Sequence, residues 1–531
     1  MCRRFLSILG LILWMIMWGC SDDKKTGKDT AGSDSGPGQG TDSATSAGTD
    51  SDTAADSDSA TGGGDNGENL YGALGNTFRY GINGGHRNKS WGDDIQARLE
   101  ARAGCTSQRI SLPERHLDQW GYEIEVGDMQ AYAALGMHSQ VAFLTSPIRA
   151  HSTAPASAED WELAYYIPKN LYEPVTTASG EINPENYWGK YVYDTVKIYS
   201  QWIKVWEIWN EPDWTDTWSF TQTWTESAPT KEQLPRFNGS IYEYIRMLRV
   251  SWEAARLADP AALIATGGIG YATFLNAILR YTDNPQDGSV TAAYPSTGGA
   301  YFDVLSFHHY PIYTPGHSDD AVAGYMNHVA ELKAELGAAQ KVVAGFENSE
   351  TGAPRFVVQE YPGGAAYARN YILKVMMTAQ STGVHGIDWF TLSDSALPGA
   401  STNAYHYMGL FADVVDLNSI DEAQITETGI ALATMSELLT DARADAAATA
   451  ALTPVDGARG WVFVKDSGQR VLSFWGVLPD EGASSVNVTV PAGEYEVHYW
   501  DFSKTRQTES FNTATSETLA VGSTPVFLVS Q

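Results

Sequence analysis

Cysteine is scarce in this chain of 531 residues, which contains only Cys2, Cys20 and Cys105. Three cysteines cannot build a disulfide framework, so the class of small disulfide-stapled secreted domains is excluded. Cys2 is expected to leave with an export signal, and Cys105 to be a small buried residue rather than a nucleophile. The fold must therefore rest on an ordinary hydrophobic core, for which a hydrophobic fraction of 43% is sufficient.

Positive charge is also in short supply. The chain has 34 Lys and Arg against 64 Asp and Glu, a formal net charge of −30. Residues 22–68 hold part of the excess, but −24 remains when they and the two N-terminal arginines are set aside. Such an acidic surface repels phosphate backbones and anionic lipid headgroups, so we expect no nucleic-acid partner. It also favours neutral over polyanionic ligands.

An apolar run at the N-terminus, residues 5–18, follows Arg3 and Arg4 and is too short to span a bilayer comfortably. It predicts a signal peptide over residues 1–19. The run ends at Met17-Trp18-Gly19-Cys20, which resembles the bacterial lipoprotein cleavage box, although Trp18 departs from the usual small residue. We expect lipidation of Cys20 and attachment to the bacterial cell envelope or surface through this anchor only. An ordinary signal peptide is the alternative.

Residues 20–69 contain almost no side chain that could form a core. The stretch 21–67 is mostly Ser, Thr, Asp, Gly and Ala, without any aromatic or aliphatic side chain larger than Ala. It cannot bury enough apolar surface to fold, so we predict a disordered linker. A flexible tether between a lipid and a folded domain needs this composition.

From about residue 71 short apolar runs alternate with amphipathic segments such as 242–257, 321–336 and 366–382. The predicted strands are 78–83, 108–111, 139–145, 205–209, 263–267, 304–308, 342–347 and 386–391. Eight strands alternating with helices predict an α/β fold, a (β/α)8 TIM barrel, over residues 70–446. The excess over a minimal barrel lies at 146–186 and 213–238, on loops that would shape a cleft.

The helical pattern stops after about residue 452. Short apolar or alternating runs at 460–464, 470–475, 485–490, 495–500 and 525–529 are separated by Gly, Asp and Pro turns. They predict a small all-β sandwich over residues 447–531 that packs beside the barrel.

One strand of the predicted barrel ends in a candidate catalytic carboxyl. The run Val205-Trp206-Glu207-Ile208-Trp209-Asn210-Glu211-Pro212 is apolar, ends in Asn-Glu, and is stopped by a proline that cannot extend a ladder. Hydrolysis of a glycosidic bond with retention needs two carboxyl groups about 5–5.5 Å apart, one protonated and one ionised. In a barrel such groups lie at the C-terminal ends of strands. Glu207 is the alternative to Glu211, but it lies within the strand.

The same run resembles the fourth-strand motif of clan A glycoside hydrolases, and is most similar to family thirty-nine, which includes β-xylosidases. Arg109 matches the second-strand Arg of that family, and Asp303-Val304-Leu305-Ser306-Phe307-His308-His309-Tyr310-Pro311 resembles its sixth-strand segment. Gly386-Ile387-Asp388-Trp389-Phe390 resembles the eighth strand, where a Trp floors the sugar site. The resemblance extends over about 70% of the chain, and a related clan A family is the alternative.

The second carboxyl is expected at the end of strand seven. Lys341-Val342-Val343-Ala344-Gly345-Phe346-Glu347-Asn348 is an apolar run ending in Glu, although Phe346 stands where the family often has Thr. Glu350, three residues further, is a second candidate. We favour Glu347 because it would directly end the strand.

The resemblance implies a role for each candidate residue. Glu211 would be the acid/base and Glu347 the nucleophile, while Asn210 would bond the sugar 2-hydroxyl. The remaining substrate-site residues implied are Arg109 and Tyr310, which would hold Glu347 ionised, His308, and the sugar-stacking Trp389 and Trp214. No cofactor is expected. No metal is expected either, because the adjacent rings of His308 and His309 would point to opposite sides of a strand and could not chelate an ion together.

The expected function is therefore that of a retaining glycosidase acting on a polysaccharide or oligosaccharide, working as a monomer. Two other interpretations stay open. A non-catalytic glycan-binding lipoprotein could keep the barrel without the chemistry, and an adhesin could use the barrel only to support its C-terminal domain.

Overall fold

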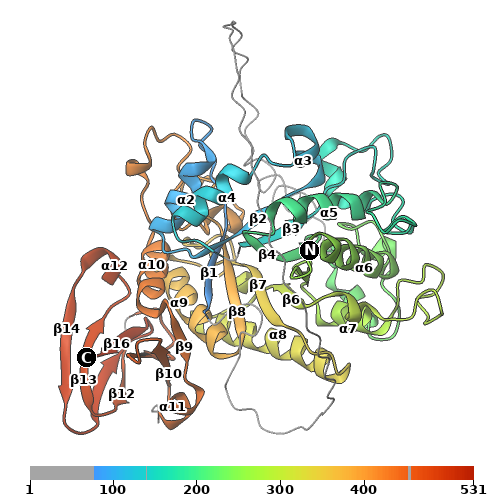
Figure 1. Cartoon of the computed structure of the whole chain (residues 1–531). Helices are drawn as coiled ribbons and strands as arrows, with labels where there is room; N and C mark the ends of the chain where they lie inside the picture. Colours follow the sequence, from blue (N-terminus) through green and yellow to red (C-terminus); the bar gives the residue numbers. More distant parts are fainter. Residues whose placement is uncertain (1–76, 139, 453–455, 483) are drawn as a thin grey trace, which may run out of the picture.

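The computed structural model describes residues 77–138, 140–452, 456–482 and 484–531 (Figure 1). Its larger part is a closed barrel in which eight parallel strands pair in chain order. The strands are β1 (Arg79–Asn83), β2 (Ser107–Ser111), β3 (Gln140–Leu144), β4 (Ile203–Ile208), β5 (Leu263–Thr266), β6 (Val304–His308), β7 (Gly345–Thr351) and β8 (Val384–Phe390). The predicted (β/α)8 barrel is confirmed, and each predicted strand overlaps an observed one.

Helices cover the outside of the barrel (Figure 1). They are α2 (Asp93–Arg102), α3 (Glu114–Trp120), α4 (Val126–Ala134), α5 (Tyr187–Tyr199), α6 (Ile241–Ala258), α7 (Ala272–Arg280), α8 (Ser318–Ala338), α9 (Ala365–Ser381) and α10 (Glu427–Leu439). Short 3₁₀ turns in the loops are η3 (Asp160–Tyr165), η4 (Trp218–Thr223), η5 (Lys231–Gln233), η6 (Gly298–Tyr301), η7 (Pro311–Tyr313), η8 (Ala404–Tyr407) and η9 (Ile420–Glu422).

Helix α6 shows why the sequence folds locally as it does. Its first turn is closed by a capping box, in which Ser240 and Glu243 each bind the other's backbone N–H. Tyr244 and Leu248, four residues apart on one face, are fully buried against the barrel. Since capping and periodicity are both local signals, the prediction of residues 242–257 as helix came within one residue of each end.

Alternation along each strand sends one set of side chains outward and the other into the barrel. In β4, Trp206 and Ile208 join the main core under the helices, whereas Val205 lies in a small apolar cluster inside the barrel. Glu207, two residues after Val205, also points inward and is fully buried. The interior is therefore apolar near the start of the strands and charged above it.

The C-terminal part is all-β, as predicted. A six-stranded antiparallel sheet has the order β14-β13-β16-β11-β10-β9, and a two-stranded sheet pairs β12 with β15. The strands are β9 (Ala442–Ala444), β10 (Ala458–Lys465), β11 (Arg470–Gly476), β12 (Val486–Val490), β13 (Gly493–His498), β14 (Thr508–Thr513), β15 (Glu517–Val521) and β16 (Val526–Ser530), with short helices α11 (Ala446–Ala451) and α12 (Phe502–Thr505). Val488, Val521, Phe474 and Leu528 from the two sheets share one buried core.

Polar contacts attach this domain to the barrel. The indole N–H of Trp475 donates to Asp319 at 2.9 Å, and Glu481 accepts a hydrogen bond of 2.7 Å from the backbone of Ser318 at the start of α8. Arg369 of α9 donates to Thr524 at 3.0 Å. The two parts are thus joined by direct hydrogen bonds, as expected of a module that packs beside the barrel.

The predicted signal peptide, Cys20 and the linker lie outside the described residues. Within the part that is described, no helix is both long and apolar enough to cross a membrane. Cys105 is buried, as expected.

Candidate active site

Glu211 lies at the C-terminal mouth of the barrel, three residues after the end of β4. Trp209 and Glu211 both have left-handed backbone conformations, with φ of 76° and 47°. Neighbouring strands hold this strained turn, because Trp209 N–H donates to Leu144 O at 2.9 Å and Glu211 N–H to Gly267 O at 2.8 Å. Backbone hydrogen bonds to β3 and to the residue after β5, on either side of β4, therefore set the direction of the Glu211 side chain.

The Glu211 carboxylate has two cationic or potentially cationic partners. Arg236 forms an ion pair with one oxygen, and His308 Nδ1 lies 3.1 Å from the other. Burial by itself raises the pKa of Glu211, but the charge of Arg236 and the hydrogen bond with His308 outweigh it and lower the pKa to about 2. In this arrangement Glu211 is ionised.

His308 reaches Glu211 because glycine leaves room for its ring. Gly268 has a φ of +61°, and a Cβ atom placed there would lie 2.1 Å from His308 Nε2. Any other residue at position 268 would displace the imidazole. As predicted, the adjacent His309 points to the other side, where its ring stacks on His328 of α8 at 5.7 Å.

Strand β7 carries two glutamates three residues apart, Glu347 and Glu350. In a regular strand such residues point to opposite faces. The pairing with β6 shifts from Phe307 opposite Asn348 to His308 opposite Glu350, which marks a bulge. Because of this bulge both glutamates face the interior, Glu347 within the barrel and Glu350 nearer its mouth.

Glu350 is only 5% exposed, and three side chains surround its carboxylate. Arg109 Nη1 donates to one oxygen at 2.7 Å, and the Tyr310 hydroxyl donates to the other at 2.8 Å. His308 Nδ1 lies 3.6 Å from that second oxygen. These contacts fix the orientation of the carboxylate.

The two mouth carboxylates face each other. Glu211, Glu350 and His308 each place one nitrogen or oxygen within 4.8 Å of the others. That spacing would suit a divalent cation, yet Arg236 is already paired with Glu211 and Arg109 with Glu350, so we assign no metal to them. The two carboxylates therefore lie on opposite sides of a small space at the barrel mouth.

The expectation that Glu347 ends strand seven is wrong. β7 runs on to Thr351, so Glu347 is its third residue and is 1% exposed. It forms an ion pair with Arg79 of β1. Burial raises the pKa of Glu347 to about 7, and Arg79 offsets that only in part. Arg109 and Tyr310, predicted to hold Glu347, donate their hydrogen bonds to Glu350 instead.

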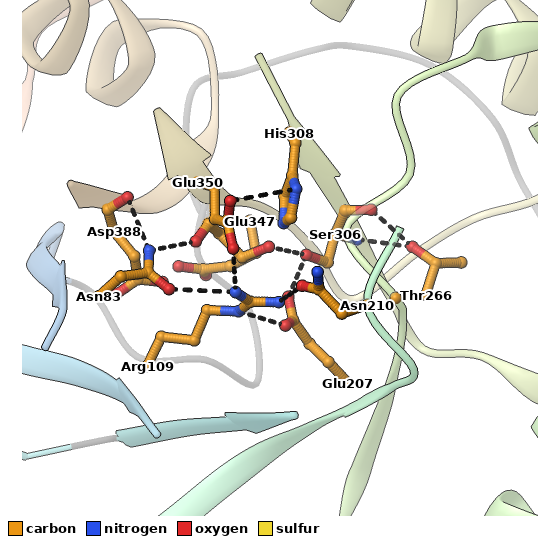
Figure 2. A network of polar contacts seen from close by, with 12 residues as sticks. Asn83, Arg109, Glu207, Asn210, Thr266, Ser306, His308, Glu347, Glu350 and Asp388 are labelled. Carbon is orange, nitrogen blue, oxygen red and sulfur yellow. Dashed lines mark hydrogen bonds and ion pairs between the residues drawn. The ribbon is translucent and has the colours of Figure 1, made fainter. Parts of the chain in front are cut away.

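Arg109 is the centre of the polar network drawn in Figure 2. Besides Glu350, its guanidinium donates to Glu207 at 2.6 Å, to Asn83 at 3.0 Å and to Asn210 at 2.8 Å. It is fully buried, and the ring of Phe143 lies 4.2 Å beneath it. Asn210 is thereby held beside Glu211 at the mouth, while Glu207 lies within the strand, as expected.

The prediction that Trp389 stacks on a sugar is wrong. Its side chain is fully buried on the outer side of β8, where the indole N–H donates to Met408 O at 2.8 Å. The next residue, Phe390, lies on the mouth side, with its ring 6.2 Å from that of Tyr310. The register of the strand decides this, because neighbouring residues point to opposite faces.

Trp214 does lie beside Glu211, on the long loop that follows β4. One face of its ring is covered by the Arg236 guanidinium, 4.2 Å from the ring centroid. A sugar could therefore stack only on the opposite face.

Several residues of this site were not predicted from the sequence. Arg236 lies within the loop at 213–238, where no motif marks it. Arg79 and Asn83 of β1 and Asp388 of β8 point into the barrel and are buried. Only this inward direction marks them as members of the polar network. Burial and the neighbouring Glu347 raise the pKa of Asp388 well above its usual range.

The fold belongs to the class of (β/α)8 barrels with an attached antiparallel domain, and solved structures share it. The chain is similar to a family 39 glycoside hydrolase from Bacteroides cellulosilyticus, with a TM-score of 0.57 and 15% identity over 86% of this chain and 81% of that one. It also resembles a glucosidase from Croceicoccus marinus (TM-score 0.53, 12% identity, 87% and 98% covered). A family 30 xylanase catalytic domain from Talaromyces cellulolyticus is a further match (TM-score 0.51, 12% identity, 86% and 98% covered).

No protein-family model matches the sequence, and no curated protein matches it. At these identities the structural likeness shows the fold. One fold can carry many chemistries, so function depends on the residues of the site.

Proposed function

We propose that this chain is a retaining glycoside hydrolase that cleaves O-glycosidic bonds of a polysaccharide or oligosaccharide. The observation that carries the proposal is the pair Glu211 and Glu350, whose facing atoms lie within 4.8 Å at the barrel mouth. Carboxyl groups about 5–5.5 Å apart are typical of retaining enzymes, whereas inverting enzymes need about 6.5–9.5 Å to admit a water. The catalytic face of such barrels is the C-terminal one.

In the first step, a Glu350 oxygen bonds to the anomeric carbon while the bond to the leaving oxygen breaks. Glu211 gives its proton to that oxygen. In the second step, a water oxygen attacks the anomeric carbon and displaces Glu350, and the water proton passes to Glu211. Asn210, next to Glu211, is placed to bond a hydroxyl of the sugar.

Glu350 is assigned as nucleophile in place of Glu347. A nucleophile must lie about 3–3.5 Å from the anomeric carbon, so it must be reachable by substrate. Glu350 lies opposite the acid/base and is oriented by Arg109 and Tyr310. Glu347 is paired with Arg79 inside the barrel.

Hydrolysis of a panel of aryl glycosides and neutral polysaccharides tests the proposal. Wild type should release product from at least one substrate, whereas Glu211→Gln and Glu350→Gln should lose nearly all turnover on it and stay folded. Absence of any hydrolysis, with retained binding of a glycan, would support a non-catalytic glycan-binding protein instead.

We further propose that the protein is exported and anchored at the cell envelope by a lipid on Cys20, and that it acts as a monomer. The cleavage-box pattern and the composition of residues 20–69 support the anchor. The negative net charge of the protein supports a neutral glycan as substrate.

A further inference from the structure

The proposed first step needs Glu211 as an acid, yet the site holds it as a carboxylate. A general acid must carry its proton when the glycosidic bond breaks. Here one Glu211 oxygen is ion-paired with Arg236, and the other is 3.1 Å from His308 Nδ1. The general base of the second step, by contrast, has to be ionised. The resting site is therefore arranged for the second step.

The backbone of Arg236 is anchored to the turn that precedes Glu211. Its carbonyl oxygen accepts a hydrogen bond of 2.9 Å from the indole of Trp209, in the strained turn before Glu211. Leu234 and Phe237, on either side in the sequence, are fully buried. The ring of Phe237 packs edge-on against that of Trp209, 5.5 Å away. The segment that carries Arg236 is thus fixed to the same turn that carries Glu211.

The Arg236 side chain is also constrained along its length. Its guanidinium lies 4.2 Å from the Trp214 ring centroid, and the side chain is 8% exposed. A stacked, buried arginine keeps its position better than a free surface one, because few rotamers satisfy both contacts. Both partners of the ion pair are therefore preorganised.

We propose that Arg236 is a positioning residue that holds Glu211 in its carboxylate form and thereby sets the pH range in which the first step runs. This inference rests on the proposed function. By stabilising the carboxylate, Arg236 favours the state of Glu211 that follows proton donation and precedes proton uptake from water. Protonation of Glu211 at the start of each turnover requires the ion pair to open or weaken as the substrate binds.

Other groups around Glu211 also bear on its protonation. They are Arg109, His308 and Glu350 from the barrel strands, Asp213 from the loop after β4, and the hydroxyls of Tyr165, Tyr271, Tyr310 and Tyr405. Of these, only His308 bonds the carboxylate of Glu211 directly. Arg236 is the permanent positive charge in contact with it.

Selective ¹³C labelling of glutamate carboxyls allows a direct test that does not require turnover. The Glu211 resonance is identified by its loss in Glu211→Gln. In wild type it should titrate near pH 2, because Arg236, together with His308, outweighs burial. In Arg236→Gln the midpoint should rise by about one pH unit or more, and Arg236→Lys, which keeps the charge, should retain most of the depression. An unchanged midpoint in Arg236→Gln would overturn the inference.

Kinetics on an active substrate provide the second measurement. The basic limb of the pH profile of kcat/KM reports the ionisation of the general acid in the free enzyme. Arg236→Gln should therefore move that limb to higher pH by about as much as it moves the Glu211 midpoint. A dinitrophenyl glycoside, whose leaving group needs no proton, should show no such movement. A shifted Glu211 midpoint without a shifted limb would refute the role in setting the pH range.

Arg280→Gln is the matched control. Arg280, the last residue of α7, donates to the carbonyl of Trp224 at 2.8 Å. Trp224 lies on the same loop as Arg236, but Arg280 itself has no contact with Glu211. It should leave both the midpoint and the limb in place. If wild type hydrolyses nothing, the proposed function fails, while the carboxyl titration still decides whether Arg236 controls Glu211.

Discussion

The hydroxyl of Tyr310 donates a hydrogen bond of 2.8 Å to Glu350. Tyr310 follows β6, and its ring packs edge-on against Tyr405 at 4.9 Å, so the hydroxyl has little freedom to move away. Together with Arg109 it orients the proposed nucleophile from outside β7.

Replacing Tyr310 by Phe should therefore reduce kcat/KM roughly 10–100-fold, because a hydrogen bond to a charged group contributes about 1.5–3 kcal/mol. The ring and its packing against Tyr405 remain, so the melting temperature should change little. Steady-state kinetics with a thermal melt of the same preparation check this. Wild-type kcat/KM in Tyr310→Phe would mean that the hydroxyl does not support the nucleophile.

Chemical rescue distinguishes the two glutamates of β7. Glu350→Gly should leave a cavity at the barrel mouth that azide can enter, which restores turnover of an activated aryl glycoside as a glycosyl azide of inverted configuration. Glu347→Gly should show no rescue, since its cavity would lie inside the barrel beside Arg79. Rescue of Glu347→Gly alone would return the nucleophile role to that residue.

Glu347 should instead affect the pH dependence of stability. Its pKa in the folded protein is about 7, above the usual value near 4.5, so the native state binds more protons than the unfolded state between these values. Stability from this group is fully present below about pH 4.5 and is lost as the pH rises through 7. The loss is on the order of 1–3 kcal/mol.

Urea denaturation of wild type and Glu347→Gln at pH 4.5 and pH 7.5 measures this effect. The fall in the free energy of unfolding over that interval should be smaller in the variant, which has no proton to release at this position. An equal fall in both proteins would show that Glu347 does not titrate in this range.

The proposed mechanism fixes the stereochemical outcome. Two displacements at the anomeric carbon restore the configuration of the substrate. The facing atoms of Glu211 and Glu350 lie within 4.8 Å of each other, closer than the separation of about 6.5–9.5 Å that inverting enzymes need. Proton NMR of the first sugar released, before mutarotation, should show retention. Inversion would mean that a carboxyl other than Glu350 acts in the reaction.

The lipid anchor is tested by Cys20→Ser. Wild type should fractionate with membranes and carry acyl mass on its N-terminus, whereas the variant should be soluble or uncleaved. Removal of residues 1–69 serves as control and should leave hydrolysis intact, since the described barrel begins after them. A soluble wild type without acyl mass would rule the anchor out.

Sequence patterns were sufficient where the signal is local. Hydrophobic periodicity located all eight barrel strands and helices such as α6, because burial on one face imposes that period whatever the neighbours are. The C-terminal strands β9, β14 and β15 were missed. β9 is only three residues long, and segments such as Thr508–Thr513 are polar and mostly exposed and leave little apolar alternation to read.

Strand ends and strand irregularities were harder to predict. The end of β7 was placed four residues too early, and a bulge against β6 lies in the missed part. A bulge arises from pairing with another strand, so the sequence of β7 alone does not reveal it. Without the bulge Glu350 would point away from the barrel interior. The choice of Glu347 rested on the predicted strand end, which the structure moves to Thr351.

The sequence by itself determined the class of fold and placed Asn210 and Glu211 after β4, because an apolar strand followed by proline marks its own end. Only the tertiary structure decided which second glutamate faces Glu211, which aromatic residue of β8 faces the mouth, and that Arg236 neutralises the proposed acid. These three outcomes depend on strand register and on a loop folding back over its own strand. Both are set by contacts between residues distant in the chain, which no local pattern contains.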